Sequence, residues 1–91
     1  MNRNVGEYLR ELADAAPGES NRSAFARIAG QNGMPSLATL YRYVDENNAG
    51  DSVRTILDAL DARRIAAGAE PTTIADFRNL TAGRGTMEAG R

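Results

Sequence analysis

Apolar residues recur at helical spacing along most of this chain. The first such stretch follows Asn4 and has apolar residues at positions 5, 8, 9, 12 and 16. Recurrence at i, i+3, i+4 and i+7 is typical of one face of an α-helix. Asn4 and Glu7 have the spacing of a capping box, in which each side chain bonds to the other residue's backbone at a helix start. This pattern predicts a first helix that ends at Pro17-Gly18.

Two short helices joined by a polar turn are predicted in the middle of the chain. The first would run over 21–29, with Ser20 as its N-cap and Gly30 just beyond its end. The second would run over 36–46, where one apolar stripe is made of Leu37, Leu40, Tyr41 and Val44. The opposite face carries small, polar and cationic side chains, namely Ser36, Ala38, Thr39, Arg42 and Tyr43.

Two further helices are predicted in the second half of the chain. The fourth would be capped by Asp51 or Ser52 and would end at Gly68. Its inner face is formed by Val53, Ile56, Leu57 and Leu60. Thr73 and Asp76 again have capping-box spacing and precede a short fifth helix. The apolar residues of that helix are Ile74, Phe77 and Leu80.

These patterns define the expected fold class. No stretch alternates apolar and polar residues over enough positions for a strand, so we expect an all-α fold, a compact bundle of four to five short helices. One domain is predicted over 1–81, and residues 82–91, which lack periodicity, are predicted to form a flexible C-terminal tail. A domain this small buries only about 60% of its unfolded surface, so well-packed helices or dimerisation must supply stability.

The composition argues against several kinds of chemistry. The 91 residues include no cysteine and no histidine, which removes thiolate ligands and the commonest general base. No serine has a candidate base beside it, and Asp58 with Asp61 lacks further ligands, so we expect no enzyme, no metal and no cofactor. No apolar run reaches membrane-spanning length, and the first residues lack the apolar core of a signal peptide. A cytoplasmic protein without a membrane partner is predicted.

Positive charge gathers near the two middle helices. The formal net charge is −1, yet no acidic residue lies between Glu19 and Asp45, where Arg22, Arg27 and Arg42 occur. Each arginine alone could equally be a solvated surface charge, but the acid-free context favours an anionic partner. A local cationic face can bind DNA despite an acidic balance elsewhere. A short helix with an apolar back and a small, cationic front suits insertion into a DNA groove.

The order of these motifs resembles the lambda-repressor/Cro-like (XRE-type) family of helix-turn-helix DNA-binding proteins. Residues 6–12, GEYLREL, resemble its opening helix, and residues 23–30, SAFARIAG, resemble its second helix. Residues 36–43, SLATLYRY, are similar to its recognition helix, and residues 52–60, SVRTILDAL, to its fourth helix. The turn at 31–35 is three residues longer than is usual in that family. The crossing angle of the two helices, and with it the depth of groove entry, is therefore open.

The residues and the resemblance together indicate a sequence-specific, repressor-like transcriptional regulator of bacterial or phage origin, with helix 36–46 in the major groove of double-stranded DNA. The candidate DNA-binding residues are Arg22, Ser23, Arg27, Ser36, Ala38, Thr39, Arg42 and Tyr43. Tyr43 is expected to reach phosphate through its hydroxyl. Arg42 is the main candidate for base readout, although Asp45 and Glu46 could pair with it instead.

A homodimer is expected, because a monomer of this size offers too little surface for high specificity. The candidate dimer interface is the apolar side of the fifth helix, formed by Ile74, Phe77 and Leu80. That helix could also cover the base of its own core.

Two alternatives to this interpretation stay open. The chain could be a small helical protein-interaction module, or an antitoxin-like partner, in which Tyr41, Tyr43 and Phe77 contribute to an interface. The second alternative places the turn of the helix-turn-helix at residues 68–74, whose spacing matches the family better than that of residues 31–35. Arg64 would then occupy a place where a small residue is needed for close helix packing.

Overall fold

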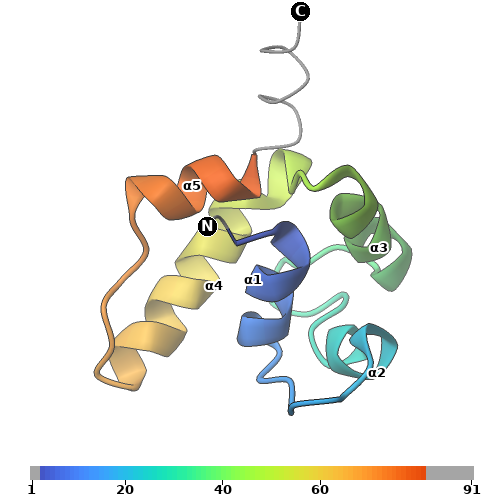
Figure 1. The fold of residues 1–91 in the computed structure, drawn as a ribbon, viewed down its shortest axis with the longest axis horizontal. Coiled ribbons are helices and arrows are strands. Elements are labelled where there is room, and N and C mark those ends of the chain that lie inside the picture. Colours follow the sequence, from blue (N-terminus) through green and yellow to red (C-terminus); the bar gives the residue numbers. More distant parts are fainter. Residues whose placement is uncertain (1–2, 82–91) are drawn as a thin grey trace, which may run out of the picture.

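The computed structural model describes residues 3–81, which form an all-α bundle (Figure 1). The helices are α1 (Val5–Leu12), α2 (Asn21–Ala26), α3 (Leu37–Glu46), α4 (Val53–Ala66) and α5 (Ile74–Leu80), with a one-turn 3₁₀ helix, η1 (Gly50–Ser52), before α4. The predicted all-α fold is confirmed, and the predicted tail over 82–91 lies outside the described residues. None of the helices described is long and apolar enough to cross a membrane.

The first helix is the element around which the others are arranged. Figure 1 shows α1 between the pair α2 and α3 and the pair α4 and α5, and α1 contacts all four. Asn4 and Glu7 form the predicted capping box at its start. The helix ends at Leu12, ahead of the predicted stop at Pro17-Gly18, because Asp14 already adopts a left-handed conformation (φ 56°). The central helix is therefore only two turns long.

The core consists mainly of residues that the helical spacing placed inside. The largest fully buried side chains are Val5, Tyr8, Leu9, Phe25, Leu40, Ile56, Leu60 and Leu80. Burying an apolar side chain of this size stabilises the fold by about 1.5–3 kcal/mol. Leu40 holds α3 against this core, and Leu37, Tyr41 and Val44 pack against its margin. The apolar stripe of α3 therefore faces inward as predicted.

Two helix ends differ from their predictions. α2 ends at Ala26, earlier than expected, because the chain turns there and reaches a left-handed Gly30 (φ 72°). At the start of α4, neither Asp51 nor Ser52 provides a side-chain cap. The Ser52 hydroxyl is bonded to the hydroxyl of Tyr43 at 2.8 Å, and the preceding 3₁₀ turn leads into the helix instead.

The rotation of α5 also differs from its prediction. Of its three apolar residues, only Leu80 is buried, while Ile74 and Phe77 are 67% and 46% exposed. The Leu80 carbonyl accepts a hydrogen bond of 2.8 Å from the backbone N–H of Ala49. Leu80 therefore belongs to the core of its own chain, and its assignment to a dimer interface was wrong.

The inward side of α5 is largely polar. Asp76 accepts hydrogen bonds from the Tyr8 hydroxyl at 2.6 Å and from Arg64 at 3.2 Å. Asn79 donates to the same Tyr8 hydroxyl at 3.0 Å. Arg64 also donates twice to Glu11, and these hydrogen bonds are the main reason why the pKa of Glu11 is lowered to about 2. This network joins α1, α4 and α5, so polar contacts as well as Leu80 hold the last helix in place.

Candidate nucleic-acid interface

The first turn of α3 carries short side chains at the surface. Ser36 is the N-cap, and its hydroxyl oxygen accepts a hydrogen bond of 3.4 Å from the N–H of Thr39. Ser36 and Ala38 are exposed, and Thr39 is half-buried. Side chains of these types make hydrogen bonds or methyl contacts to base edges in the major groove of DNA. This end of α3 is therefore open to a close approach by a groove.

Arg42 lies one turn farther along α3 and is exposed. Within residues 3–81, the arginines that form ion pairs are Arg3, Arg27, Arg63 and Arg64. Neither Asp45 nor Glu46 pairs with Arg42, although both follow it on the same helix. Its guanidinium lies over the ring of Tyr43, with the central carbon 5.7 Å from the ring centre. The positive charge of Arg42 is thus available to a partner.

Tyr43 does not share the outer face with Arg42, and the prediction that it contacts phosphate was wrong. Its side chain is 5% exposed, and its hydroxyl is bonded to Ser52. Residues three apart on a helix share a face, so the rotation that buries Leu40 also turns position 43 inward. The ring lies close to Gly50, where an added Cβ would come within 3.4 Å of ring atom Cε1.

Ser23 and Arg27 are held by a carboxylate of their own chain. Glu19 accepts a hydrogen bond of 2.6 Å from the Ser23 hydroxyl and one of 2.9 Å from Arg27. Arg27 also donates to the carbonyl of Ala13 at 2.9 Å. The pKa of Glu19 lies far below its usual value, mainly because of the hydrogen bond from Arg27, so the pair stays charged at neutral pH. Instead of the predicted free phosphate contacts, these side chains tie α2 to the segment that follows α1.

Arg22 completes the predicted set of arginines. It is exposed in the first turn of α2, and in the described part of the chain it forms no ion pair. The same holds for Arg54 on α4, which was not among the predicted site residues, and for Arg78 on α5. Of the three arginines predicted near the two middle helices, Arg22 and Arg42 therefore keep an unpaired charge.

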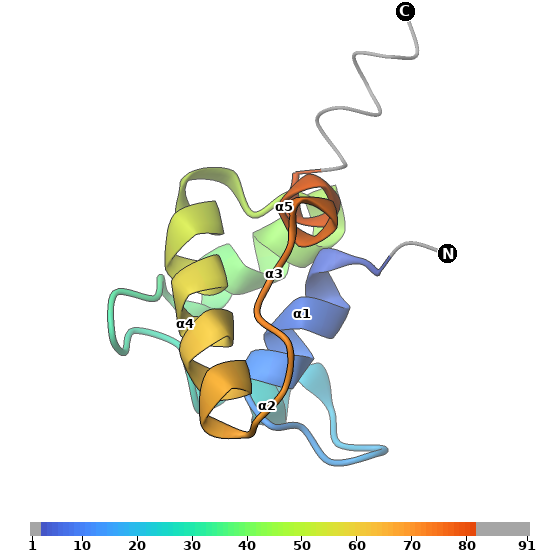
Figure 2. The same ribbon diagram turned by 90° about the vertical axis from the view of Figure 1, so that its left-hand side faces the viewer.

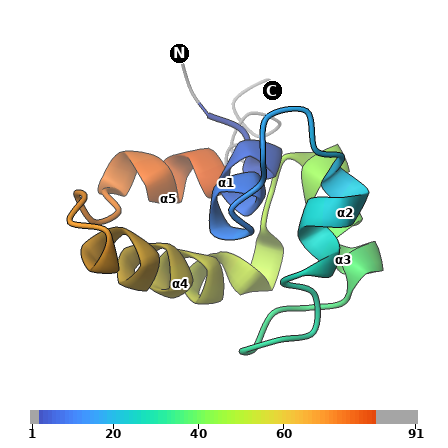
Figure 3. The same cartoon turned by 90° about the horizontal axis from the view of Figure 1, so that it is seen from below.

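The long turn between α2 and α3 is closed at its base. The backbone N–H of Gly30 donates to the carbonyl of Pro35 at 2.9 Å. The residues between them project from the body as a separate loop and return to the start of α3 (Figures 2 and 3). Asn32 and Gly33 turn the chain in left-handed conformations (φ 51° and 84°). The extra residues thus form a loop that points away from the bundle. The hydrogen bond between Gly30 and Pro35 keeps the two ends of that loop close together.

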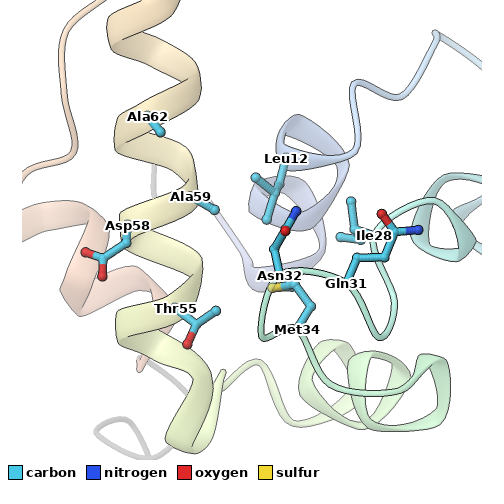
Figure 4. A pocket seen from close by; sticks show the side chains of 9 residues that line it. All are labelled: Leu12, Ile28, Gln31, Asn32, Met34, Thr55, Asp58, Ala59 and Ala62. Carbon is cyan, nitrogen blue, oxygen red and sulfur yellow. The ribbon is translucent and has the colours of Figure 1, made fainter.

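Met34 anchors this loop to the rest of the fold. It is 8% exposed, and together with Leu12 it lines one side of a groove whose other side is α4 (Figure 4). The groove has a volume of about 630 Å³, and Ala59 of α4 points across it. Asp58 is the one charged side chain of the lining and points away from the loop in this view. The groove is thus a seam between the loop and α4, and its lining is mostly apolar or uncharged.

A contact that sequence reasoning missed fixes the other end of α3. Asn47 accepts a hydrogen bond of 3.0 Å on its side-chain oxygen from the backbone N–H of Val5. Asn47 also ends α3 in a left-handed conformation (φ 52°), which asparagine tolerates better than most residues. The sequence signal that could have indicated this helix end is an asparagine directly after the apolar stripe of α3. The contact ties the end of α3 to the start of α1 and so fixes its orientation.

The alternative turn at 68–74 leads to a different kind of helix. It connects α4 to α5, which has 7 residues and whose polar side is bonded to Tyr8 and Arg64. The exposed side of α5 carries Ile74 and Phe77, which suit an apolar contact better than a DNA groove. The arrangement around α3 is therefore the better candidate for a nucleic-acid interface.

Residues 3–81 hold no group of three or more His, Cys, Asp or Glu side chains that could bind a metal ion. Comparisons with protein-family models, with curated proteins and with solved structures found no match for this chain. The resemblance to the lambda-repressor/Cro-like family therefore rests on the sequence motifs alone.

Proposed function

We propose that this chain is a sequence-specific, repressor-like DNA-binding protein in which α2 and α3 act as a helix-turn-helix and α3 enters the major groove. The observation that carries the proposal is the exposed, unpaired charge of Arg42 on a helix whose opposite side holds the fully buried Leu40. An arginine in this position can donate two hydrogen bonds to O6 and N7 of guanine, the commonest specific contact in the major groove.

The polarity of α3 indicates which of its ends approaches the DNA. Its first turn has the short side chains of Ser36 and Ala38, whereas its last turn carries the exposed carboxylates of Asp45 and Glu46. Carboxylates repel phosphate, so the first turn enters and the last turn stays outside. Recognition helices of this kind place their N-terminal residues on base edges. Arg22, in the first turn of α2, then faces the phosphate backbone and sets the register of the protein on the duplex.

The closed base of the long turn supports this arrangement. A turn three residues longer than usual would separate two helices if it were extended. Because Gly30 bonds to Pro35, the added length is absorbed in the loop between them. The contact between α2 and α3, and their shared packing on α1, is consistent with a helix-turn-helix in spite of the additional residues.

Two copies of the chain would read two half-sites. A single module of this kind buries only about 600–1,000 Å² on DNA, which limits its specificity. Ile74 and Phe77 lie on the outer side of α5, with no role in the core, and would form the contact between the copies. Leu80 would act only indirectly, by docking α5 from within.

A protein-interaction module is the second candidate. It is favoured by three large apolar side chains that are exposed: Ile65 at 64%, Ile74 at 67% and Phe77 at 46%. Ile74 and Phe77 are three residues apart on α5 and so share one face, and exposed apolar patches often mark protein contacts. In this case the partner would be another protein, and α3 would carry no nucleic acid.

The salt dependence of binding to random duplex DNA tests the proposal. A DNA-binding protein should lose affinity steeply as salt rises, because its arginines displace counterions from phosphates. Arg42→Ala should weaken binding, whereas Arg78→Ala, which removes from α5 another exposed arginine without an ion pair in residues 3–81, should not. Absence of DNA binding even at low salt would leave the interaction module as the function.

A further inference from the structure

We infer that Tyr43 is a positioning residue for Arg42, because its buried ring holds the guanidinium in the direction that base readout requires. This inference deepens the proposed function and rests on it. The Tyr43 hydroxyl was predicted to bind phosphate, but it is buried and bonded to Ser52. The same observations leave the face of the ring, instead of the hydroxyl, as the part of Tyr43 that contacts Arg42.

The Tyr43 ring is fixed on several sides. Its hydroxyl is bonded to Ser52 at 2.8 Å, which ties the far end of the side chain to the start of α4. Its edge lies against Gly50, which has a φ of 55° and no side chain to displace it. Only 5% of the residue is exposed. The ring is therefore held in one position, whereas the side chains on the exposed side of α3 are small or flexible.

The guanidinium of Arg42 lies over this stationary ring. Its central carbon is 5.7 Å from the ring centre, within the range at which the ring's negative face attracts a cation. An exposed arginine otherwise samples many rotamers, and these must be given up when it makes two hydrogen bonds to one base. The contact with Tyr43 restricts those rotamers before DNA arrives. Pre-organisation of this kind raises affinity without adding a contact to the ligand.

A double-mutant cycle on DNA affinity separates positioning from general support of the fold. Tyr43→Leu removes the ring, and Tyr43→Phe keeps the ring while losing only the bond to Ser52. In the protein with Arg42 present, Tyr43→Leu should weaken DNA binding by about two- to five-fold, which corresponds to an exposed cation–π contact. In an Arg42→Ala background the same change should have no effect. Tyr43→Phe should retain most of the affinity in the presence of Arg42.

A second measurement covers the case in which Tyr43→Leu fails to fold. In DNA-free protein, ¹⁵N relaxation of the arginine side-chain Nε groups should show Arg42 to be more restricted than Arg78. In Tyr43→Phe the ring is kept, and this difference should persist. Equal mobility of the two arginines would overturn the inference.

The outcomes also distinguish this inference from the proposed function. Loss of affinity from Tyr43→Leu that is equal with and without Arg42 would show a purely structural effect and would overturn the inference while DNA binding stands. If the unmodified protein binds no DNA, the proposed function fails, and the positioning role fails with it.

Discussion

The hydroxyl of Tyr8 donates a 2.6 Å hydrogen bond to Asp76, joining α1 to α5 across 68 positions of sequence. Asn79 donates to the same hydroxyl, and Arg64 connects Asp76 to Glu11. The last helix is thus held by directional polar contacts on its inner side together with the buried Leu80. Because these contacts fix its rotation, its apolar residues at positions 74 and 77 face solvent. The polar network and Leu80 together therefore determine which surface the bundle presents at this end.

Removing the Tyr8 hydroxyl should weaken the fold measurably. Tyr8→Phe leaves the ring in the core but takes a hydrogen-bond partner from Asp76 and from Asn79, so we expect a loss of about 1–3 kcal/mol in the free energy of unfolding. Denaturant unfolding measures the change. Tyr41→Phe is the matched control, because within residues 3–81 the Tyr41 hydroxyl forms no hydrogen bond with a side chain or backbone group. Equal effects of the two changes would show that the network contributes nothing specific.

The same network predicts how stability depends on pH. Hydrogen bonds from Arg64, and then from Arg3, lower the pKa of Glu11 in the folded state from 4.5 to about 2. A folded pKa below the unfolded one stabilises the protein fully above the unfolded value, and this contribution is lost as pH falls from about 4.5 towards about 2. The difference in unfolding free energy between the unmodified protein and Glu11→Gln should therefore shrink over that window.

A control for this experiment is Glu46→Gln, on the exposed end of α3, where the described residues provide no ion pair. This variant removes a carboxylate without removing an ion pair, so it reports the effect of the charge change alone. A difference for Glu11→Gln that stays constant between about pH 4.5 and about pH 2 would contradict the assignment of the low pKa to the Arg64 contact.

Leu40 should be a principal stabilising residue of α3. It is fully buried where α3 meets the core, so Leu40→Ala should lower the free energy of unfolding by about 2–5 kcal/mol through lost burial and a residual cavity. Leu37→Ala, on the same stripe but only half-buried, should cost clearly less. Thermal and denaturant unfolding compare the two variants. If Leu37→Ala is the more damaging change, the rotation of α3 described above is wrong.

The hydrophobic periodicity was sufficient to predict the helices and most of the core. The spacing of apolar residues in α1, α3 and α4 directly reports the faces that pack, and Tyr8, Leu40 and Ile56 are fully buried as predicted. The capping boxes at the starts of α1 and α5 were also visible, because they depend on residues three apart. Local signals of this kind need no knowledge of the rest of the fold.

The candidate site was predicted less completely, because its side chains depend on contacts between distant segments. Glu19 pairs with Arg27 over eight positions, so the charge of Arg27 is neutralised within the chain although the side chain stays exposed, and no helical spacing reports this pairing. Tyr43 was placed on the wrong face although it follows the buried Leu40 by three residues, and its bond to Ser52, which depends on the turn into α4, was not visible in the sequence. The helical spacing correctly placed Arg42 and Ala38 on the exposed side of α3, opposite the apolar stripe.

Association through α5 can be tested apart from the fold. Phe77 is 46% exposed and has no role in the core, so Phe77→Asp should leave the melting temperature nearly unchanged. If the chain dimerises through α5 as proposed, the same substitution should produce a monomer. Leu80→Asp, by contrast, places a charge in the core and should unfold the chain. Sedimentation together with a melting curve separates the two effects. A chain that is monomeric before any substitution would remove the dimer from the proposal.

The most direct test of the central claim, that α3 reads bases in the major groove through Arg42, is selection of binding sites from random duplexes followed by methylation interference at guanine N7. The unmodified protein should enrich one sequence, and methylation of a particular guanine should block its binding, because N7 lies in the major groove. Arg42→Ala should tolerate that methylation and should lose about 1–3 kcal/mol of preference for that base. Enrichment of no sequence, or identical interference patterns for the unmodified protein and Arg42→Ala, would contradict the claim.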